Sequence, residues 1–476
     1  MKKIKVLWIC NIMLPVFAEA LGEEGSNKEG WLAGLCDTIM EREEENNIEL
    51  HVAYPVKTQG DYERLTVCGK KGKLYGYRFY EDVSHAEQYE PALEERLARV
   101  IAMVEPDVIH CFGTEFAHGL AVASCCEHKE RLVVGMQGVC QAIAKAYMAD
   151  LPEWVQNSVT FRDWLKKDSI RQQQQKFALR GEREKELLGL VGNVLGRTDF
   201  DRYYVQGCNP DVHYFSVNET LRHCFYEGKW EYDQCEPHTI FLSQGDYPLK
   251  GLHYMLLAAA LLQKKYPDLK LRIAGNSLVN YRTLKDKLKL SGYGKYLREL
   301  MREHGLEDRV CFLGSLKAEE MKAEYLKCGL HVCCSSNENS PNSLGEAMLL
   351  GVPCVAADVG GIPSLFTDGE DGIMYRGYKI PGDNYNNTCF DCEAEKRHLC
   401  HMDGHSLNEE EKNGINTELQ QNAHRLAQAV ERMWEDKEKM LYYCENARKH
   451  ARITHDKEAN YKKMMEIYAR LAEEKV

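Results

Sequence analysis

The stretch CSSNENSPNSLGEAMLLGVPCVAADVGG, residues 334–361, decides the fold class of this chain. It begins within one apolar run, GLHVCCSS (329–336), and contains a second, VPCVAAD (352–358), with a short helical pattern between them. Pro341 prevents a helix from continuing through the loop, and Gly351 ends the helix that follows. This order of strand, loop, helix and strand predicts a parallel α/β sheet.

Two carboxylates, Glu338 and Glu346, occur in this stretch with seven residues between them. We expect Glu338 on a loop beyond a strand and Glu346 in the first helical turn, in a capping box with Ser343 as N-cap. Open α/β sheets bind ligands at this edge, where the helix start and Gly360-Gly361 offer N–H groups to an anion. Taken singly, each glutamate also fits a structural role, as a cap or a solvated loop charge. The combined order favours a site.

The same β/α alternation runs through the rest of the chain in two successive series. Further apolar runs of the kind that forms buried parallel strands occur at 4–10, 48–54, 107–112, 131–136, 190–196, 238–245, 269–276 and 309–315. Two series predict two doubly wound, Rossmann-like α/β domains, and 476 residues suffice for two cores.

The expected domain limits follow from composition. Residues 1–217 form the N-terminal domain, 218–237 a polar and aromatic linker, 238–455 the C-terminal domain and 456–476 a last amphipathic helix. Residues 378–415 interrupt the alternation with Asn, Asp, Glu and Gly, and we interpret them as an inserted loop.

Composition and charge disfavour several classes of protein. The formal net charge of −12 disfavours nucleic-acid binding by the molecule as a whole. No apolar run approaches the ~20 residues that span a bilayer, and no secretory pattern opens the chain. Several of the 19 cysteines lie inside apolar runs, so we expect reduced thiols in a cytoplasmic protein. A dinucleotide dehydrogenase is disfavoured because no GxGxxG follows the first strand.

The order of residues from Glu338 onward resembles the signature of glycosyltransferase family 4, the group 1 glycosyltransferases. Glu338, seven residues, Glu346, and then EAMLLGVPCVAADVGG and DGEDG follow that order and spacing. PDVIHCFG (106–113) is similar to an N-terminal strand of the family. The resemblance implies the GT-B fold, with two Rossmann-like domains facing a cleft and a C-terminal helix returning to the N-terminal domain. It also implies sugar transfer from a nucleotide-sugar with retention of configuration and without a metal.

The resemblance assigns roles to residues of the donor site. Glu346 is expected to bind the nucleotide ribose and Glu338 to face the donor sugar, since a carboxylate accepts hydrogen bonds from two hydroxyls. Lys250 would neutralise the leaving diphosphate, so we assign catalysis to Glu338 and Lys250. The arginine that the family usually places before this lysine is replaced by Gly245 or Asp246. The other expected donor contacts are Asn342, Ser343, Leu344, Gly360, Gly361, Gly30 and Arg197.

Three residues of the N-terminal half are candidates for contact with the acceptor or a sugar. His110 matches a histidine of the family strand, Gln137 stands where many relatives carry histidine, and His118 follows on a helix. A lone histidine such as His118 is also compatible with a structural role. No general base is assigned, because the leaving phosphate is thought to take the proton in retaining members.

The family also suggests partners. Its capsular and exopolysaccharide members imply a UDP- or GDP-sugar donor, a glycan or lipid-linked acceptor, and no further cofactor. Two other functions stay open: a non-catalytic nucleotide-sugar-binding or scaffold protein, and a GT-B nucleotide-sugar epimerase.

Three patterns have a second interpretation. DFD (199–201) spells a metal motif, but Thr198 before it predicts a capped helix start. The cysteines and histidines of 389–405, among them Cys389, Cys392 and Cys400, lack a second regular pair, and a structural zinc there stays open. Segment 153–188 mixes aromatic and basic residues, which predicts either a helix packed on its own domain or peripheral contact with an anionic membrane.

Overall fold

The computed structural model describes residues 3–23, 30–42, 45, 47–57, 64–69, 72–281, 283–380 and 417–473. The chain divides into two compact units: unit 1 is Met1–Ala144, Lys176–Glu227 and Ala451–Val476, and unit 2 is Lys145–Gln175 and Gly228–His450. Three of the four points of division fall within helices, namely α6 (Cys140–Ala146), α9 (Ile170–Leu190) and α18 (Lys437–Thr454), and the fourth follows Glu227. The domain limits drawn from composition stay a prediction, and the two units differ from them in counting 145–175 with unit 2.

Unit 1 contains a sheet in the order β3-β4-β2-β1-β5-β6-β7-β8, parallel except for the β3–β4 pair. The strands are β1 (Ile4–Ile9), β2 (Ile48–Val56), β3 (Arg64–Gly69), β4 (Gly72–Tyr80), β5 (Val108–Phe112), β6 (Leu132–Gly135), β7 (Asn193–Gly196) and β8 (His213–Ser216). Five of them coincide with predicted apolar runs. The antiparallel hairpin β3–β4 and the edge strand β8 were not predicted.

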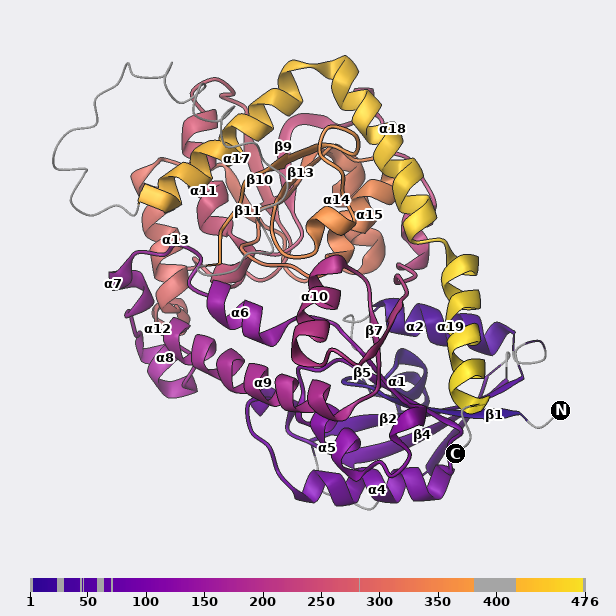
Figure 1. Ribbon diagram of the computed structural model, residues 1–476. Coiled ribbons are helices and arrows are strands. Elements are labelled where there is room, and N and C mark those ends of the chain that lie inside the picture. Colours follow the sequence, from indigo (N-terminus) through magenta and orange to yellow (C-terminus); the bar gives the residue numbers. More distant parts are fainter. Residues whose placement is uncertain are drawn as a thin grey trace. The chain divides into compact units, whose positions relative to one another are not determined.

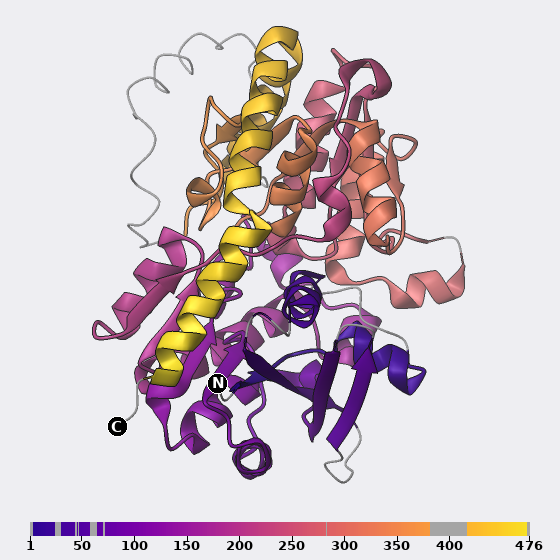
Figure 2. The same ribbon diagram turned by 90° about the vertical axis from the view of Figure 1, so that its right-hand side faces the viewer.

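Helices of unit 1 cover its sheet. They include α1 (Pro15–Leu21), α2 (Gly30–Glu41), α4 (Ala92–Val104), α5 (Ala117–Cys125), α10 (Asp199–Cys208) and α19 (Lys457–Glu473). The last helix, α19, contacts β1 and β5 (Figure 2) and places Tyr468 and Leu471 in the same core as Trp8 and Phe17. The C-terminal helix therefore returns to the N-terminal unit, as expected.

Unit 2 contains a parallel sheet in the order β11-β10-β9-β12-β13-β14. Its strands are β9 (Glu236–Leu242), β10 (Lys270–Ile273), β11 (Val310–Phe312), β12 (Cys328–Cys333), β13 (Cys354–Ala357) and β14 (Ile373–Tyr375). Its helices include α7 (Glu153–Gln156), α8 (Phe161–Lys166), α11 (Leu252–Leu262), α12 (Leu284–Lys289), α13 (Gly292–Glu303), α14 (Ala318–Lys327), α15 (Asn342–Leu350) and α17 (Thr417–Glu435). Helices α14 and α15 cover one face, and α11 and α17 cover the other (Figure 1).

Burial on both faces explains why the strands read as continuous apolar runs. All six residues of β12 are buried, as are the four of β13. Every cysteine whose side chain the structure describes is a free thiol, in agreement with the expectation from sequence. Among the described helices, none combines the length and apolar character needed to cross a bilayer.

Candidate functional site

The candidate site lies at the carboxyl ends of β9 and β12 in unit 2. Glu338 is on the loop between β12 and α15, and Lys250 ends a short 3-10 turn, η5 (Pro248–Lys250), that follows β9. Lys250 Nζ lies 2.5 Å from Glu338 Oε1, and Ser335 Oγ donates to the same oxygen at 2.7 Å. The structure thus brings together the two residues expected to carry catalysis, which are 88 positions apart.

Both members of this ion pair are largely buried, with side chains 18% and 13% exposed. Burial by itself would lower the pKa of Lys250, but the nearby Glu338 carboxylate and Tyr247 raise that pKa above its ordinary value. Lys250 is therefore a fixed cation. Removing one partner of a buried pair leaves an uncompensated charge, which makes each residue dependent on the other.

Two glycines allow the loops of the site to approach closely. Gly251 has φ +71°, and a Cβ there would lie 1.9 Å from the carbonyl oxygen of Cys334. Gly360 has φ +54°, and a Cβ there would lie 2.0 Å from the carbonyl oxygen of Glu338. The N–H of Gly361 donates to that same carbonyl at 2.9 Å. Because the N–H of Gly361 is used within the loop, the N–H expected to contact a ligand at this turn is that of Gly360.

Helix α15 starts two residues earlier than predicted. Its N-cap is Pro341, and no side chain caps it, so the predicted capping box of Ser343 and Glu346 is wrong. The reason is that Asn342 is already helical, which moves Glu346 beyond the first turn, where it is 3% exposed. Leu344 N–H donates back to the Pro341 carbonyl at 3.0 Å, so the expected amide donors are those of Asn342 and Ser343.

Two buried amide oxygens point to a ligand at this helix start. Asn337 Oδ1 and Asn342 Oδ1 have no hydrogen-bond partner among the described residues, and Asn337 is only 2% exposed. Buried polar atoms are normally paired, so hydroxyl donors of a ligand would complete them. Ser335 and Asn337 were not predicted, although a cluster of small polar residues directly after a strand is a usable signal.

At one of the two alternative positions for the arginine that the family usually places before Lys250, a side chain would displace its buried neighbours. A Cβ at Gly245 would lie 2.9 Å from Leu252 Cδ2 and 3.2 Å from Ile273 Cγ2. The other position, Asp246, is an exposed acid. Positive charge at this turn therefore comes from Lys250.

Three candidates of unit 1 line one pocket: His110, Gln137 and Arg197. The Arg197 guanidinium pairs with Glu219 and donates to the carbonyls of Met136 at 2.6 Å and Gln137 at 3.0 Å. Glu219 was not found from the sequence, since nothing local links it to Arg197. The donor contact expected of Arg197 stays a prediction, and the pairing argues against it because the charge is balanced within unit 1.

Both histidine candidates are buried and hydrogen-bonded in unit 1. His110 Nδ1 accepts from Tyr468 Oη at 2.7 Å, and burial lowers the pKa of His110 to about 3, so it is neutral. His118 is fully buried with Nδ1 2.6 Å from Glu81 Oε2, while its Nε2 has no partner among the described residues. Despite the desolvation that burial brings, the His118 charge lowers the pKa of Glu81. The acceptor roles of both histidines stay predictions.

The remaining predicted features are placed as follows. Gly30, one of the expected donor contacts, begins α2. Thr198 and Asp201 form the predicted cap of α10, with both hydrogen bonds of a capping box. No group of metal-ligating side chains occurs in the part of the chain that the structure describes. Cys389, Cys392 and Cys400 lie outside it.

Comparison with known sequences supports the family resemblance for part of unit 2. Residues 229–380 match the family model described as "Glycosyl transferases group 1". D-inositol 3-phosphate glycosyltransferase of Corynebacterium urealyticum is 33% identical over 135 residues, 27% of this chain and 29% of that protein. The enzyme of the same name from Corynebacterium kroppenstedtii is 31% identical over 136 residues, 27% of each chain. The matches thus span less than a third of the length of these relatives.

Comparison with solved structures covers nearly the whole chain. Sucrose-phosphate synthase from Thermosynechococcus elongatus has a TM-score of 0.64 at 14% identity, covering 98% of this chain and 99% of that one. Anabaena HepE, solved with UDP and glucose, has a TM-score of 0.60 at 14% identity, covering 98% and 99%. The fold is GT-B. At this identity the likeness concerns the fold alone.

Proposed function

We propose that this protein is a retaining glycosyltransferase of family 4 that moves a hexose from a UDP- or GDP-sugar to a glycan or lipid-linked acceptor. The observation that carries the proposal is the buried Lys250–Glu338 pair, 2.5 Å apart at the edge of the unit 2 sheet. Both residues lie within the segment that matches the group 1 glycosyltransferase model. Polysaccharide assembly in the cytoplasm, without a metal, is part of the proposal.

The geometry of unit 2 supports separate roles for the cationic groups and the oxygen acceptors of the site. When the bond between the anomeric carbon and the diphosphate breaks, negative charge develops on the leaving phosphate. The Lys250 ammonium and the amides at the start of α15 supply fixed positive charge for it. Glu338 and Asn337 offer oxygen acceptors to sugar hydroxyls. The leaving phosphate would then receive the proton of the acceptor hydroxyl.

Donor binding is the first test. We expect a panel of UDP-, GDP- and ADP-sugars to identify one that raises the melting temperature, since a ligand at 100 times its Kd adds roughly 2.7 kcal/mol. Glu346→Gln should weaken binding of that donor, because the buried carboxylate is proposed to hold the ribose. Glu319→Gln, an exposed glutamate on α14 of the same unit, is the matched control. Equal donor affinity in both variants would refute the ribose assignment.

Acceptor-dependent turnover is the second test. Free nucleotide should appear only when a polyprenyl-linked or free oligosaccharide is added, and NMR of the product should show the anomeric configuration of the donor. One observation favours a second function, nucleotide-sugar binding without transfer: the family arginine is replaced by Gly245, where a Cβ would press on Leu252 and Ile273, or by Asp246. Tight donor binding with no acceptor-dependent nucleotide release would support that alternative.

A further inference from the structure

Two short helices of unit 2 carry large apolar side chains on the surface. Helices α8 and α12 contact each other, and Figure 1 shows them side by side. On α8, Phe161, Trp164 and Leu165 are 59%, 67% and 64% exposed. On α12, Leu284 and Leu288 are 79% and 57% exposed. We call these five side chains the apolar patch. Such clustering, unlike single exposed apolar residues, marks an interaction surface.

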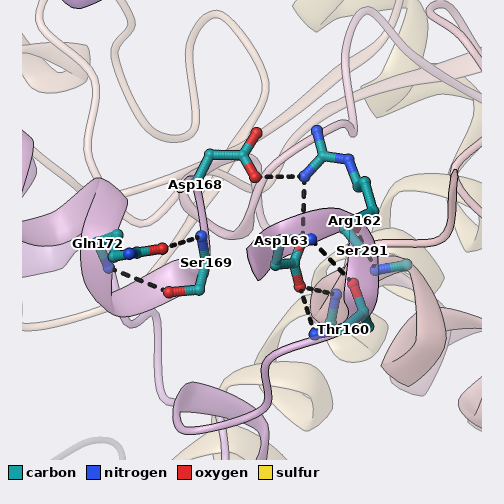
Figure 3. A network of polar contacts seen from close by, with 9 residues as sticks. Thr160, Arg162, Asp163, Asp168, Ser169, Gln172 and Ser291 are labelled. Atoms are coloured by element: carbon teal, nitrogen blue, oxygen red, sulfur yellow. Dashed lines mark hydrogen bonds and ion pairs between the residues drawn. The ribbon is translucent and has the colours of Figure 1, made fainter. Parts of the chain in front are cut away.

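The position of α8 is fixed by a buried polar network, shown in Figure 3. Asp163, 2% exposed, forms a capping box with Thr160 at the start of α8. The same carboxylate accepts from Gly292 N–H at 2.8 Å, at the start of α13, and from Arg162 at 3.0 Å. Arg162 also pairs with Asp168 at 2.7 Å. Because these hydrogen bonds hold the polar side of α8, Trp164 and Leu165 point outward in the folded protein.

Exposed basic residues lie on the same two helices as the apolar patch. Exposed lysines flank it on both helices: Lys166 and Lys167 at the end of α8, and Lys285, Lys287 and Lys289 on α12. The acidic residues of these helices are engaged in structure, Asp163 as described and Asp286 as the capping-box partner of Thr283. The local charge is thus positive, although the whole chain has a formal net charge of −12.

We propose that the apolar patch and its lysines form a docking surface for an anionic lipid bilayer. Trp and Phe prefer the interface between headgroups and acyl chains, and lysines beside them reach the lipid phosphates. Charge complementarity selects anionic over zwitterionic lipid. The surface belongs to unit 2, which includes residues 145–175 and α12, and so it extends beyond the predicted 153–188 segment. It does not depend on the proposed sugar transfer.

Flotation of the full chain with lipid vesicles tests the proposal. We expect binding to vesicles of phosphatidylcholine with 30% phosphatidylglycerol at low salt, and little binding to pure phosphatidylcholine or at high salt. Each lysine changed to alanine should lower the partition coefficient about fivefold. Two double variants probe the two components: Trp164→Ser with Leu284→Ser, and Lys166→Glu with Lys285→Glu. Both should abolish flotation.

Matched controls separate the patch from general surface changes. Met103→Ser with Ile453→Ser removes two apolar side chains that are 50% and 76% exposed elsewhere. Lys264→Glu with Lys463→Glu makes the same charge change at exposed positions away from the patch. Both control pairs should float like the parent, and all variants should keep its melting temperature because the changed side chains are exposed. Flotation equal in patch and control variants would overturn the proposal. So would a parent that stays unbound at low salt, or a dimer that is lost on Trp164→Ser.

Discussion

Lys250 and Glu338 set the charge of the candidate site at the scale of single residues. The pair is buried, and the carboxylate keeps the lysine protonated across the physiological pH range. An ammonium held in place before the reaction stabilises developing charge without reorganising, which is why such groups have large effects on rate.

Lys250→Ala should therefore lower turnover by a factor of roughly 100 or more. The donor Kd should change less, because the ribose contact expected of Glu346 remains. Steady-state kinetics with the donor identified by thermal shift gives both numbers. Since the substitution also leaves Glu338 without its partner, melting curves must show that the variant is folded at the assay temperature. Lys264→Ala, an exposed lysine of the same unit, is the control. Parental turnover in Lys250→Ala would remove this lysine from the mechanism.

Alanine substitutions at Gly360 and Gly369 separate the cost of a left-handed backbone from the cost of a close contact. Gly360 and Gly369 both have positive φ, +54° and +75°, but only Gly360 has a carbonyl oxygen, that of Glu338, where a Cβ would be. Gly369→Ala should lower the free energy of unfolding by about 1–2 kcal/mol, the cost of a left-handed residue. Gly360→Ala should cost more and should also weaken donor binding by displacing the Glu338 loop. Equal midpoints in urea for the two variants would contradict this account.

The sequence predicted which residues form the candidate site, but it did not predict which side chains pair with them. Glu338, Lys250 and the helix start at residues 341–343 follow from one quoted stretch and one Lys-Gly pair. The pairing across 88 positions depends on strands β9 and β12 being neighbours, which spacing alone does not show. The same holds for Glu81 with His118 and Glu219 with Arg197, each an acid from a distant element. Local sequence carries no signal for such contacts.

At the scale of elements, the buried parallel strands were predictable because both of their faces are apolar. The edge hairpin β3–β4 was missed because its strands are antiparallel and mix polar with apolar residues, as in GKLYGYRFY. Strand β14 was also missed, because its three residues are too few to form a recognisable apolar run. The start of α15 was misplaced by two residues, since Pro341 is the N-cap and the capping-box pattern had suggested Ser343.

Helix α18 is joined to the DGEDG loop by two hydrogen bonds between titratable side chains: Tyr442 Oη donates to Glu370 Oε2 at 2.8 Å, and His450 contacts Asp371. His450 Nδ1 lies 2.7 Å from Asp371 Oδ2, and this hydrogen bond raises the pKa of His450 although burial opposes it. A histidine with a raised pKa contributes stability that is full below its unfolded value of about 6.5 and is lost as pH rises through the folded value.

His450→Ala should thus destabilise the protein more at pH 6 than at pH 9. Urea unfolding of parent and variant at both pH values gives the difference in free energy. His223→Ala, at an exposed histidine whose ring is 77% accessible, is the control and should show little change at either pH. A His450→Ala effect that is the same at pH 6 and pH 9 would show that the contact is not between charged groups.

At the scale of the whole molecule, the two ends of the chain meet in one unit. Strand β1 begins near the N-terminus and α19 ends near the C-terminus, and both belong to the core of unit 1. Tyr468 Oη joins them: it accepts from Trp8 Nε1 at 2.9 Å and donates to His110 Nδ1 at 2.7 Å. Unit 2 carries the Lys250–Glu338 pair, so folding of unit 1 and donor binding can be perturbed separately.

Tyr468→Phe should destabilise unit 1 while leaving donor affinity unchanged. The substitution keeps the ring in the core but leaves the buried groups of Trp8 and His110 without their common partner, at a cost of roughly 1–3 kcal/mol for each group. Hydrogen exchange should become faster in β1, β5 and α19, which contact one another, and stay unchanged in β12 and α15. Tyr442→Phe, with a side chain 51% exposed, is the control and should alter neither region. If exchange in β12 rose as much as in β1, the two units would not respond as separate bodies, and the assignment of the helix to unit 1 alone would fail.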